Sequence, residues 1–90
     1  MSAGAHQADE ARRRRLRWRA RRGLLENDLV MARFFDRFEA SLTDADVAGL
    51  DRLLDLADGE LLDLILGRRE LDGEAATPSA RRVLGMLRSV

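Results

Sequence analysis

The side chains that could do chemistry are unevenly distributed along this sequence. A single histidine, His6, lies near the N-terminus, and there is no cysteine. The lack of cysteine excludes disulfides, thiolate metal sites and cysteine nucleophiles. Carboxylates recur through the middle of the chain at Asp51, Asp55, Asp58 and Asp63. General acid–base catalysis would require such carboxylates to be buried, and their pattern instead fits a solvated helix face.

No other motif for catalysis or ligand binding is present. The sequence has no glycine-rich phosphate loop and no metal-ligand spacing. Ser41 and Ser79 fall at predicted helix boundaries, where serine commonly caps the backbone. His6 belongs to a stretch of mostly small residues, 1–6, that we expect to be disordered, and we expect its side chain to be exposed. These observations predict that the protein is not an enzyme.

The positive charges are concentrated in one segment. Formal net charge is zero, yet eight arginines fall within residues 12–22, while residues 36–63 hold nine acids and two arginines. An arginine-rich helix with Trp18 as a stacking group is typical of nucleic-acid-binding modules. The acids of neighbouring helices could instead pair with the arginines inside the molecule. The zero net charge favours internal pairing, and nucleic-acid binding stays as the alternative function.

The stretch WRARRGLLENDLVMARFF, residues 18–35, joins the arginines to an apolar segment through Gly23. Taken singly, Gly23 fits the end of one helix, and Glu26 and Asp28 fit the first turn of the next, where acids interact favourably with the helix dipole. Trp18 taken singly is more often a residue of the core than a stacking platform. These separate explanations leave the order of the residues unexplained.

The elements expected to position these residues are helices. Leucine, alanine and arginine dominate, while aromatic and β-branched residues are scarce. The pattern predicts an all-α fold, a small five-helix antiparallel bundle, in a single domain over residues 1–90. The helices are expected at residues 7–22, 24–40, about 43–57, 59–66 and from Thr77 onward. Residues 67–76 are expected to be a connector.

Apolar residues at spacings of three and four predict one buried face for each helix. In the second helix this face comprises Leu25, Leu29, Ala32, Phe35, Phe38 and Leu42. Thr43 with Asp46 three residues later resembles a capping box, and Thr77–Pro78 is a typical helix start. No apolar run approaches the roughly 18 residues of a membrane span, and the N-terminus lacks the apolar core of a secretory signal. We therefore expect a cytoplasmic protein without membrane insertion.

The order of residues in the stretch 18–35 resembles the signature of the SdhE family of bacterial assembly factors. The signature residues are Trp18, Arg21, Arg22, Gly23, Glu26, Asp28, Phe34 and Phe35. Residues 42–68 are similar to the family's third and fourth helices, so the resemblance covers roughly residues 12–68. The family often has tryptophan near the position of Leu64, and the tail after Arg69 matches no family feature.

The resemblance implies a chaperone-like factor that binds the unassembled flavoprotein subunit of succinate dehydrogenase, and in bacteria that of fumarate reductase. It implies promotion of covalent FAD attachment to that subunit, with no FAD bound stably by this chain. Carried onto this sequence, it implies partner binding by Arg21, Arg22, Gly23, Glu26 and Asp28, with structural support from Trp18, Phe34 and Phe35. A structural or toxin–antitoxin-like helical adaptor is a third class, with only the size of the chain in its favour.

Overall fold

The computed structural model of the protein describes residues 4–21 and 23–90. Over these ranges it contains six α-helices, two short 3-10 helices and no strand. The α-helices are α1 (Gly4–Ala8), α2 (Glu10–Ala20), α3 (Leu25–Phe38), α4 (Asp44–Leu54), α5 (Asp58–Ile65) and α6 (Pro78–Arg88), and the 3-10 helices are η1 (Glu39–Ser41) and η2 (Gly73–Ala75). The all-α prediction is confirmed, with six α-helices in place of the five expected.

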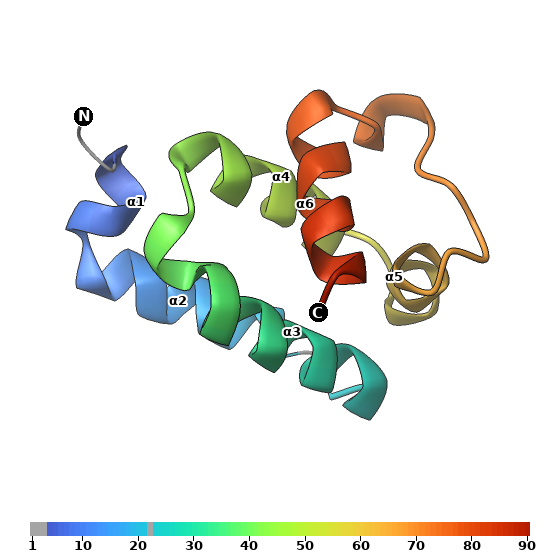
Figure 1. The fold of residues 1–90 in the computed structure, drawn as a ribbon, viewed down its shortest axis with the longest axis horizontal. Helices are drawn as coiled ribbons and strands as arrows, with labels where there is room; N and C mark the ends of the chain where they lie inside the picture. The colour runs from blue at the N-terminus through green and yellow to red at the C-terminus, as the bar shows by residue number, and fades with distance from the viewer. Residues whose placement is uncertain (1–3, 22) are drawn as a thin grey trace.

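The helices enclose one core. Figure 1 shows α3 along the lower edge of the molecule, α4 and α6 above it, and α1 and α5 at opposite ends. The most extensive helix–helix contact is between α4 and α6, and α3 contacts α2, α5 and α6. None of the helices described is long and apolar enough to cross a membrane. The arrangement leaves the junction between α2 and α3 at the surface.

The first predicted helix is divided in two at Asp9. The Asp9 side chain caps α2 by accepting a hydrogen bond from the Arg12 backbone N–H at 3.2 Å. This hydrogen bond also lowers the pKa of the Asp9 carboxyl below its ordinary value. A capping aspartate favours a helix start at the next residue, and the residues before it form the separate helix α1.

Residues 1–6 were expected to be disordered, but residues 4–6 belong to helix α1. Residues 1–3 lie outside the described residues. Asp44, at the start of α4, accepts hydrogen bonds from the backbone N–H groups of Ala5 and His6 at 3.0 and 2.9 Å. Gln7 also donates a hydrogen bond to the carbonyl oxygen of Leu42 at 2.9 Å. His6 is consequently buried rather than exposed, with 4% of its surface accessible. The carboxylate of Asp44 satisfies backbone donors that a five-residue helix cannot satisfy itself.

We expect acidification to release α1 from α4. The backbone N–H groups of His6 and then Ala5 hold the pKa of Asp44 below its ordinary value of 3.8. A carboxyl with a lowered pKa in the folded state stabilises that state above about pH 4, and this contribution is lost as the pH falls through the folded-state pKa. The amide NMR signals of Ala5 and His6 should therefore move first in an acid titration.

The Asp44→Asn variant is the control for this titration, because it cannot change charge with pH. Its Ala5 and His6 signals should lack the acid transition seen in the wild-type protein. An identical transition in both proteins would assign the effect to another group, such as Asp9, which also has a lowered pKa.

Helix α3 buries only part of the face predicted for it, because Phe35 is in the core as predicted but the leucines before it are not. Met31, Phe34 and Phe35 are at most 5% exposed, whereas Leu25 and Leu29 are 66% and 49% exposed. Ala32 is exposed as well, while the predicted core residue Leu42 is buried and Phe38 packs against the core. The rings of Phe34 and Phe35 meet edge to face, with centroids 5.3 Å apart. With Phe34 buried beside Phe35, the inner face of the helix is turned toward Met31, and Leu25 and Leu29 lie at the surface.

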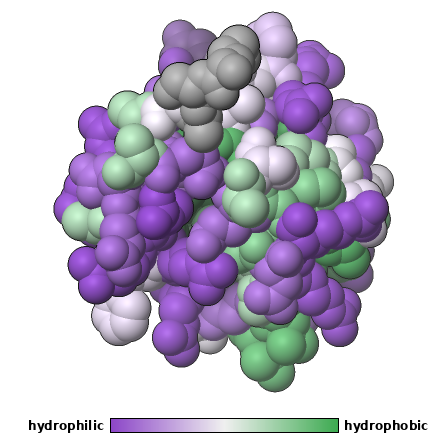
Figure 2. All heavy atoms as spheres, turned by 60° about the vertical axis from the view of Figure 1, so that its left-hand side comes forward, coloured by the Kyte–Doolittle hydropathy of each residue, from purple (hydrophilic) through white to green (hydrophobic). Residues whose placement is uncertain are grey.

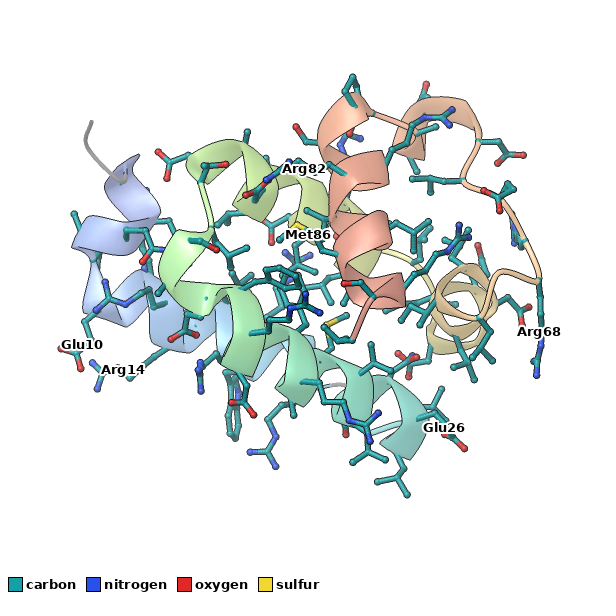
Figure 3. All side chains as sticks on the ribbon, viewed as in Figure 1. Glu10, Arg14, Glu26, Arg68, Arg82 and Met86 are labelled. Carbon is teal, nitrogen blue, oxygen red and sulfur yellow. The ribbon has the colours of Figure 1, made fainter. Side chains whose placement is uncertain are left out.

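The contact between α4 and α6 joins two well-capped helices. The predicted capping box is present, because Thr43 and Asp46 each bond the other's backbone N–H. At the start of α6, Thr77 accepts a hydrogen bond from the Ala80 backbone N–H at 3.1 Å. The buried carboxylate of Asp46 also accepts a hydrogen bond from Nε of Arg82 at 2.9 Å, and Arg82 lies where the two helices meet (Figure 3). One side chain therefore caps α4 and pairs with α6.

Candidate partner-docking surface

The glycine of the motif lies in an open turn between α2 and α3. Arg21 ends α2, and its backbone N–H donates to the carbonyl oxygen of Trp18 at 3.1 Å. Gly23 follows with φ of +88°, a conformation that residues with a Cβ rarely adopt, and Leu24 is the N-cap of α3. Apart from the neighbours of Gly23 in the chain, no described residue has an atom within 4 Å of the position that a Cβ on Gly23 would occupy. The backbone at this turn is therefore accessible to another molecule.

The two acids of the motif differ in environment. Glu26 is exposed in the first turn of α3, and Figure 3 shows it at the end of the helix, pointing away from the molecule. Asp28 is half-buried and already has an interaction partner within the chain. Arg22, the remaining predicted contact, lies outside the described residues. The structure therefore brings Arg21, Gly23 and Glu26 to one exposed region, with Asp28 beside them.

Asn27 is a residue of this site that the sequence did not single out. Asn27 lies between Glu26 and Asp28 in the sequence, and its side chain is fully buried. Its Nδ2 donates a hydrogen bond to the carbonyl oxygen of Asp58 at 3.0 Å. Asp58 is the first residue of α5, so the bond ties the beginning of α3 to the beginning of α5. The four-residue spacing from Asn27 to the buried Met31 is the signal that could have placed it on the inner face.

Trp18 was expected to support the first helix from within the core, and this expectation is wrong. It is 74% exposed, whereas Leu16 and Ala20 on the same helix are buried. Residues two positions apart point to nearly opposite sides of an α-helix, so Trp18 faces away from the side that packs. The guanidinium of Arg21 lies 5.8 Å from the centre of the indole ring. Phe34 and Phe35, predicted as structural support, are both buried in the core.

The arginines of α2 are divided between internal pairs and surface charge. Arg17 pairs with Glu39, and Arg19 pairs with Asp51 and, at 2.6 Å, with Asp55. Four other arginines of this cluster are exposed, and they make no ion pair with any residue that the structure describes. These are Arg12, Arg14, Arg15 and Arg21. Internal pairing therefore accounts for only part of the cluster, and positive charge remains on the surface along α2, with Arg21 near Gly23.

The arrangement favours recognition over chemistry. Among the residues that the structure describes, no group of three or more histidine, aspartate or glutamate side chains could hold a metal ion. Glu26 and Arg21 are both exposed, as recognition groups are, and neither lies in an enclosed cleft. Guanidinium and carboxylate groups beside an accessible backbone suit charge-assisted hydrogen bonds to a second protein.

The chain matches one known protein family over most of its length. The family described as "Flavinator of succinate dehydrogenase" matches residues 14–90. The chain belongs to this flavinator family. The match includes the tail after Arg69, where α6 packs on α4, although the sequence signature alone extended only to about residue 68.

The relatives of this flavinator-family chain carry one name. The chain is 54% identical to an FAD assembly factor SdhE of Ralstonia nicotianae, over 99% of this chain and 94% of that protein. It is 37% identical to an FAD assembly factor SdhE of Acetobacter pasteurianus, over 82% of this chain and 69% of that protein. The corresponding Pseudomonas aeruginosa protein is 31% identical, over 89% of this chain and 90% of that protein. No solved structure matches the chain.

Proposed function

We propose that this protein is an FAD assembly factor that binds the unassembled flavoprotein subunit of succinate dehydrogenase and promotes covalent attachment of FAD to it. Membership of the flavinator family, with the near full-length similarity to an FAD assembly factor, carries the proposal. The flavoprotein subunit of fumarate reductase is a second client under the same proposal. The protein acts in the bacterial cytoplasm, where its client is folded before assembly.

In this proposal the chemistry takes place on the client, and the chain is not an enzyme. Gly23 lets the client backbone approach closely, because it has no side chain of its own and no described residue beyond its chain neighbours lies within 4 Å of its Cβ position. Arg21 donates and Glu26 accepts charge-assisted hydrogen bonds on either side of it. Arg22 and Asp28 complete the set of partner-binding residues. Binding holds the FAD domain of the client with its reactive groups in position, and positioning alone can accelerate a reaction strongly.

FAD itself fits the described surface poorly, and no step of the proposal requires this chain to hold it. An open groove of about 590 Å³ lies between α2 and α4. Its lining holds the carboxylates of Asp44 and Asp51 and the guanidinium groups of Arg12, Arg15 and Arg19. A pyrophosphate there would lack the glycine-rich turn leading into a helix that dinucleotide-binding folds supply. We therefore assign FAD to the client alone.

A reconstituted flavinylation reaction tests the proposed function. The purified apo flavoprotein subunit of succinate dehydrogenase is incubated with FAD, with or without this protein, and covalent flavin is measured in the denatured subunit. We expect the protein to form a one-to-one complex with the subunit and to accelerate covalent flavin formation. Equal rates with and without it, and no complex, would reject the proposal. Nucleic acid that co-purifies and is released by high salt would support the alternative module.

Replacing Glu26 by alanine should weaken this reaction without unfolding the protein. An exposed acid in the first turn of a helix contributes only about 0.3–1 kcal/mol to stability through the helix dipole. A charge-assisted hydrogen bond to the client is worth about 1.5–3 kcal/mol, so we expect binding to weaken roughly tenfold or more. The measurements are the dissociation constant for the apo subunit and the thermal melting temperature.

Glu10→Ala is the matched control for Glu26→Ala. Glu10 is also an exposed acid in the first turn of a helix, and it lies at the opposite end of the molecule from Glu26 (Figure 3). The two variants should lose similar stability, but only Glu26→Ala should lose affinity. Equal affinities for the two variants would remove Glu26 from the docking surface.

A further inference from the structure

A groove between α2 and α3 adjoins the motif and is not explained by it. Its volume is about 450 Å³. Its floor is formed by side chains that belong to the core, Ala20, Met31 and Phe35. One wall is formed by Leu25 and Leu29, which are 66% and 49% exposed although they are large and apolar.

The exposed leucines form a continuous apolar strip. Leu25 and Leu29 are four residues apart on α3, so their side chains are neighbours on one helix face. Figure 2 shows a largely hydrophilic surface on which apolar atoms protrude at the lower edge, level with α3 in Figure 1. Exposed apolar surface rimmed by charged groups is typical of a protein-interaction site.

The two rims of the groove carry opposite charges. Arg17 and Arg21 line the side formed by α2, while Asp28 and Asp36 line the side formed by α3. Arg17 already pairs with Glu39, whereas Arg21 makes no ion pair within the described residues. A bound segment is therefore oriented by charge, with its acidic side toward α2 and its basic side toward α3.

The groove is continuous with the surface around Gly23. Arg21 and Asp28 line the groove and also belong to the motif, with Gly23 between them along the chain. The walls are helices, whose central backbone groups are bonded within each helix and cannot pair with a strand. A helix satisfies its own backbone hydrogen bonds, so it suits these walls better than an extended strand does.

We propose that the groove between α2 and α3 receives an amphipathic helix of the client flavoprotein subunit. Apolar side chains of this helix pack on Leu25 and Leu29, its acidic flank faces Arg21, and its basic flank faces Asp36. This inference rests on the proposed function and adds to it the chemistry of the client segment. The motif around Gly23 and the groove then form one interface with two parts.

Serine substitutions in the leucine strip test the proposal against a matched control. Leu25→Ser and Leu29→Ser remove apolar contact from the groove, and Leu66→Ser removes an equally exposed leucine (52%) that does not line it. The dissociation constant for the purified apo flavoprotein subunit is measured by calorimetric titration, with a thermal melt of each variant. We expect each groove variant to bind about tenfold more weakly and Leu66→Ser to bind within twofold of wild type.

The possible outcomes separate this inference from the proposed function. If both groove variants bind as tightly as wild type while Glu26→Ala does not, the groove is not part of the interface and the inference is overturned. If the wild-type protein does not bind the apo subunit, the proposed function and the inference both fall. If wild type sediments as a dimer that Leu29→Ser dissociates, a second copy of the chain occupies the groove and the inference is overturned.

The direction of the bound helix has its own test. Asp36→Arg places a positive charge on the rim proposed to face the basic flank of the client helix. We expect it to weaken binding at low salt, with the deficit shrinking as salt is added. Arg33→Asp, a charge reversal on α3 outside the groove lining, should have no comparable effect. Tighter binding by Asp36→Arg would overturn the proposed orientation.

Discussion

Gly23→Arg should abolish binding of the client flavoprotein subunit while the protein stays folded. The substitution places a long, charged side chain on a backbone surface where, apart from the neighbours of Gly23 in the chain, no described residue has an atom within 4 Å of the Cβ position. The client would have to move away from the turn or displace this side chain. We expect a loss of affinity of at least a hundredfold and no stimulation of covalent flavin formation, because a displaced client loses the neighbouring contacts as well.

Gly23→Ala separates this steric effect from backbone strain. The φ of +88° at Gly23 costs any residue with a Cβ about 1–2 kcal/mol, which corresponds to a fall in melting temperature of roughly 4–16 °C. Alanine and arginine incur the same strain, but only arginine adds bulk. We therefore expect similar melting temperatures for the two variants and much weaker binding by Gly23→Arg alone. Equal losses of binding would show that Gly23 matters only as a turn residue.

Gly49→Ala should be the most destabilising small substitution in the molecule. Gly49 lies on α4 against the beginning of α6, and an added Cβ would be 2.4 Å from the backbone oxygen of Ser79. Backbone atoms cannot rotate aside, so the two helices must separate. Overpacking of this kind costs typically 1–3 kcal/mol, and this site should fall at the upper end, lowering the melting temperature by roughly 10–20 °C.

Gly85→Ala is the control for the steric argument at Gly49. Gly85 is an exposed residue of α6, and an added Cβ would meet no atom within 4 Å. Both substitutions gain the higher helix propensity of alanine, so Gly85→Ala should raise stability by up to about 1 kcal/mol. Chemical denaturation of both variants gives the comparison. A Gly49→Ala protein as stable as wild type would mean that α4 and α6 do not approach as closely as the structure indicates.

Features of the fold that are determined locally could be predicted from the sequence. The capping box of Thr43 and Asp46 and the start of α6 at Thr77–Pro78 depend on residues three positions apart or fewer, and both are present. Such hydrogen bonds depend little on the rest of the fold, which is why they can be read directly from the chain. Gly23 does lie in the turn after the arginine-rich helix, with a positive φ, although α2 already ends at Ala20 with Arg21 as its extended C-cap.

The buried face of α3 was only partly predictable, because two series of residues overlap on it. The predicted series of Leu25, Leu29, Ala32, Phe35 and Phe38 and a second series of Asn27, Met31, Phe34 and Phe38 both have helical spacing. Periodicity alone cannot choose between them, because either could face a core. The second series and Phe35 lie in the core or pack against it, and only the beginning of the first series, Leu25, Leu29 and Ala32, is exposed. Leu25 and Leu29, which were predicted to be buried, instead form one wall of the groove.

Contacts distant in sequence account for the other missed features. Helix α1 depends on Asp44, which lies 38 residues beyond His6 in the chain. The burial of Asn27 depends on the carbonyl of Asp58, 31 residues away. No local pattern near His6 or Asn27 indicates these partners, so a chain read segment by segment assigns His6 to disorder and leaves Asn27 unassigned.

The exposure of Trp18 also determines what the intrinsic tryptophan fluorescence of the protein can report. Trp18 is the only tryptophan in the chain, and its indole is already in contact with solvent in the folded state. Its emission should therefore change little when the helices unfold, and melting is better followed by circular dichroism. Arg21 lies over the indole and also lines the groove, so a bound client should shift that emission. Unlabelled protein can then report docking separately from folding.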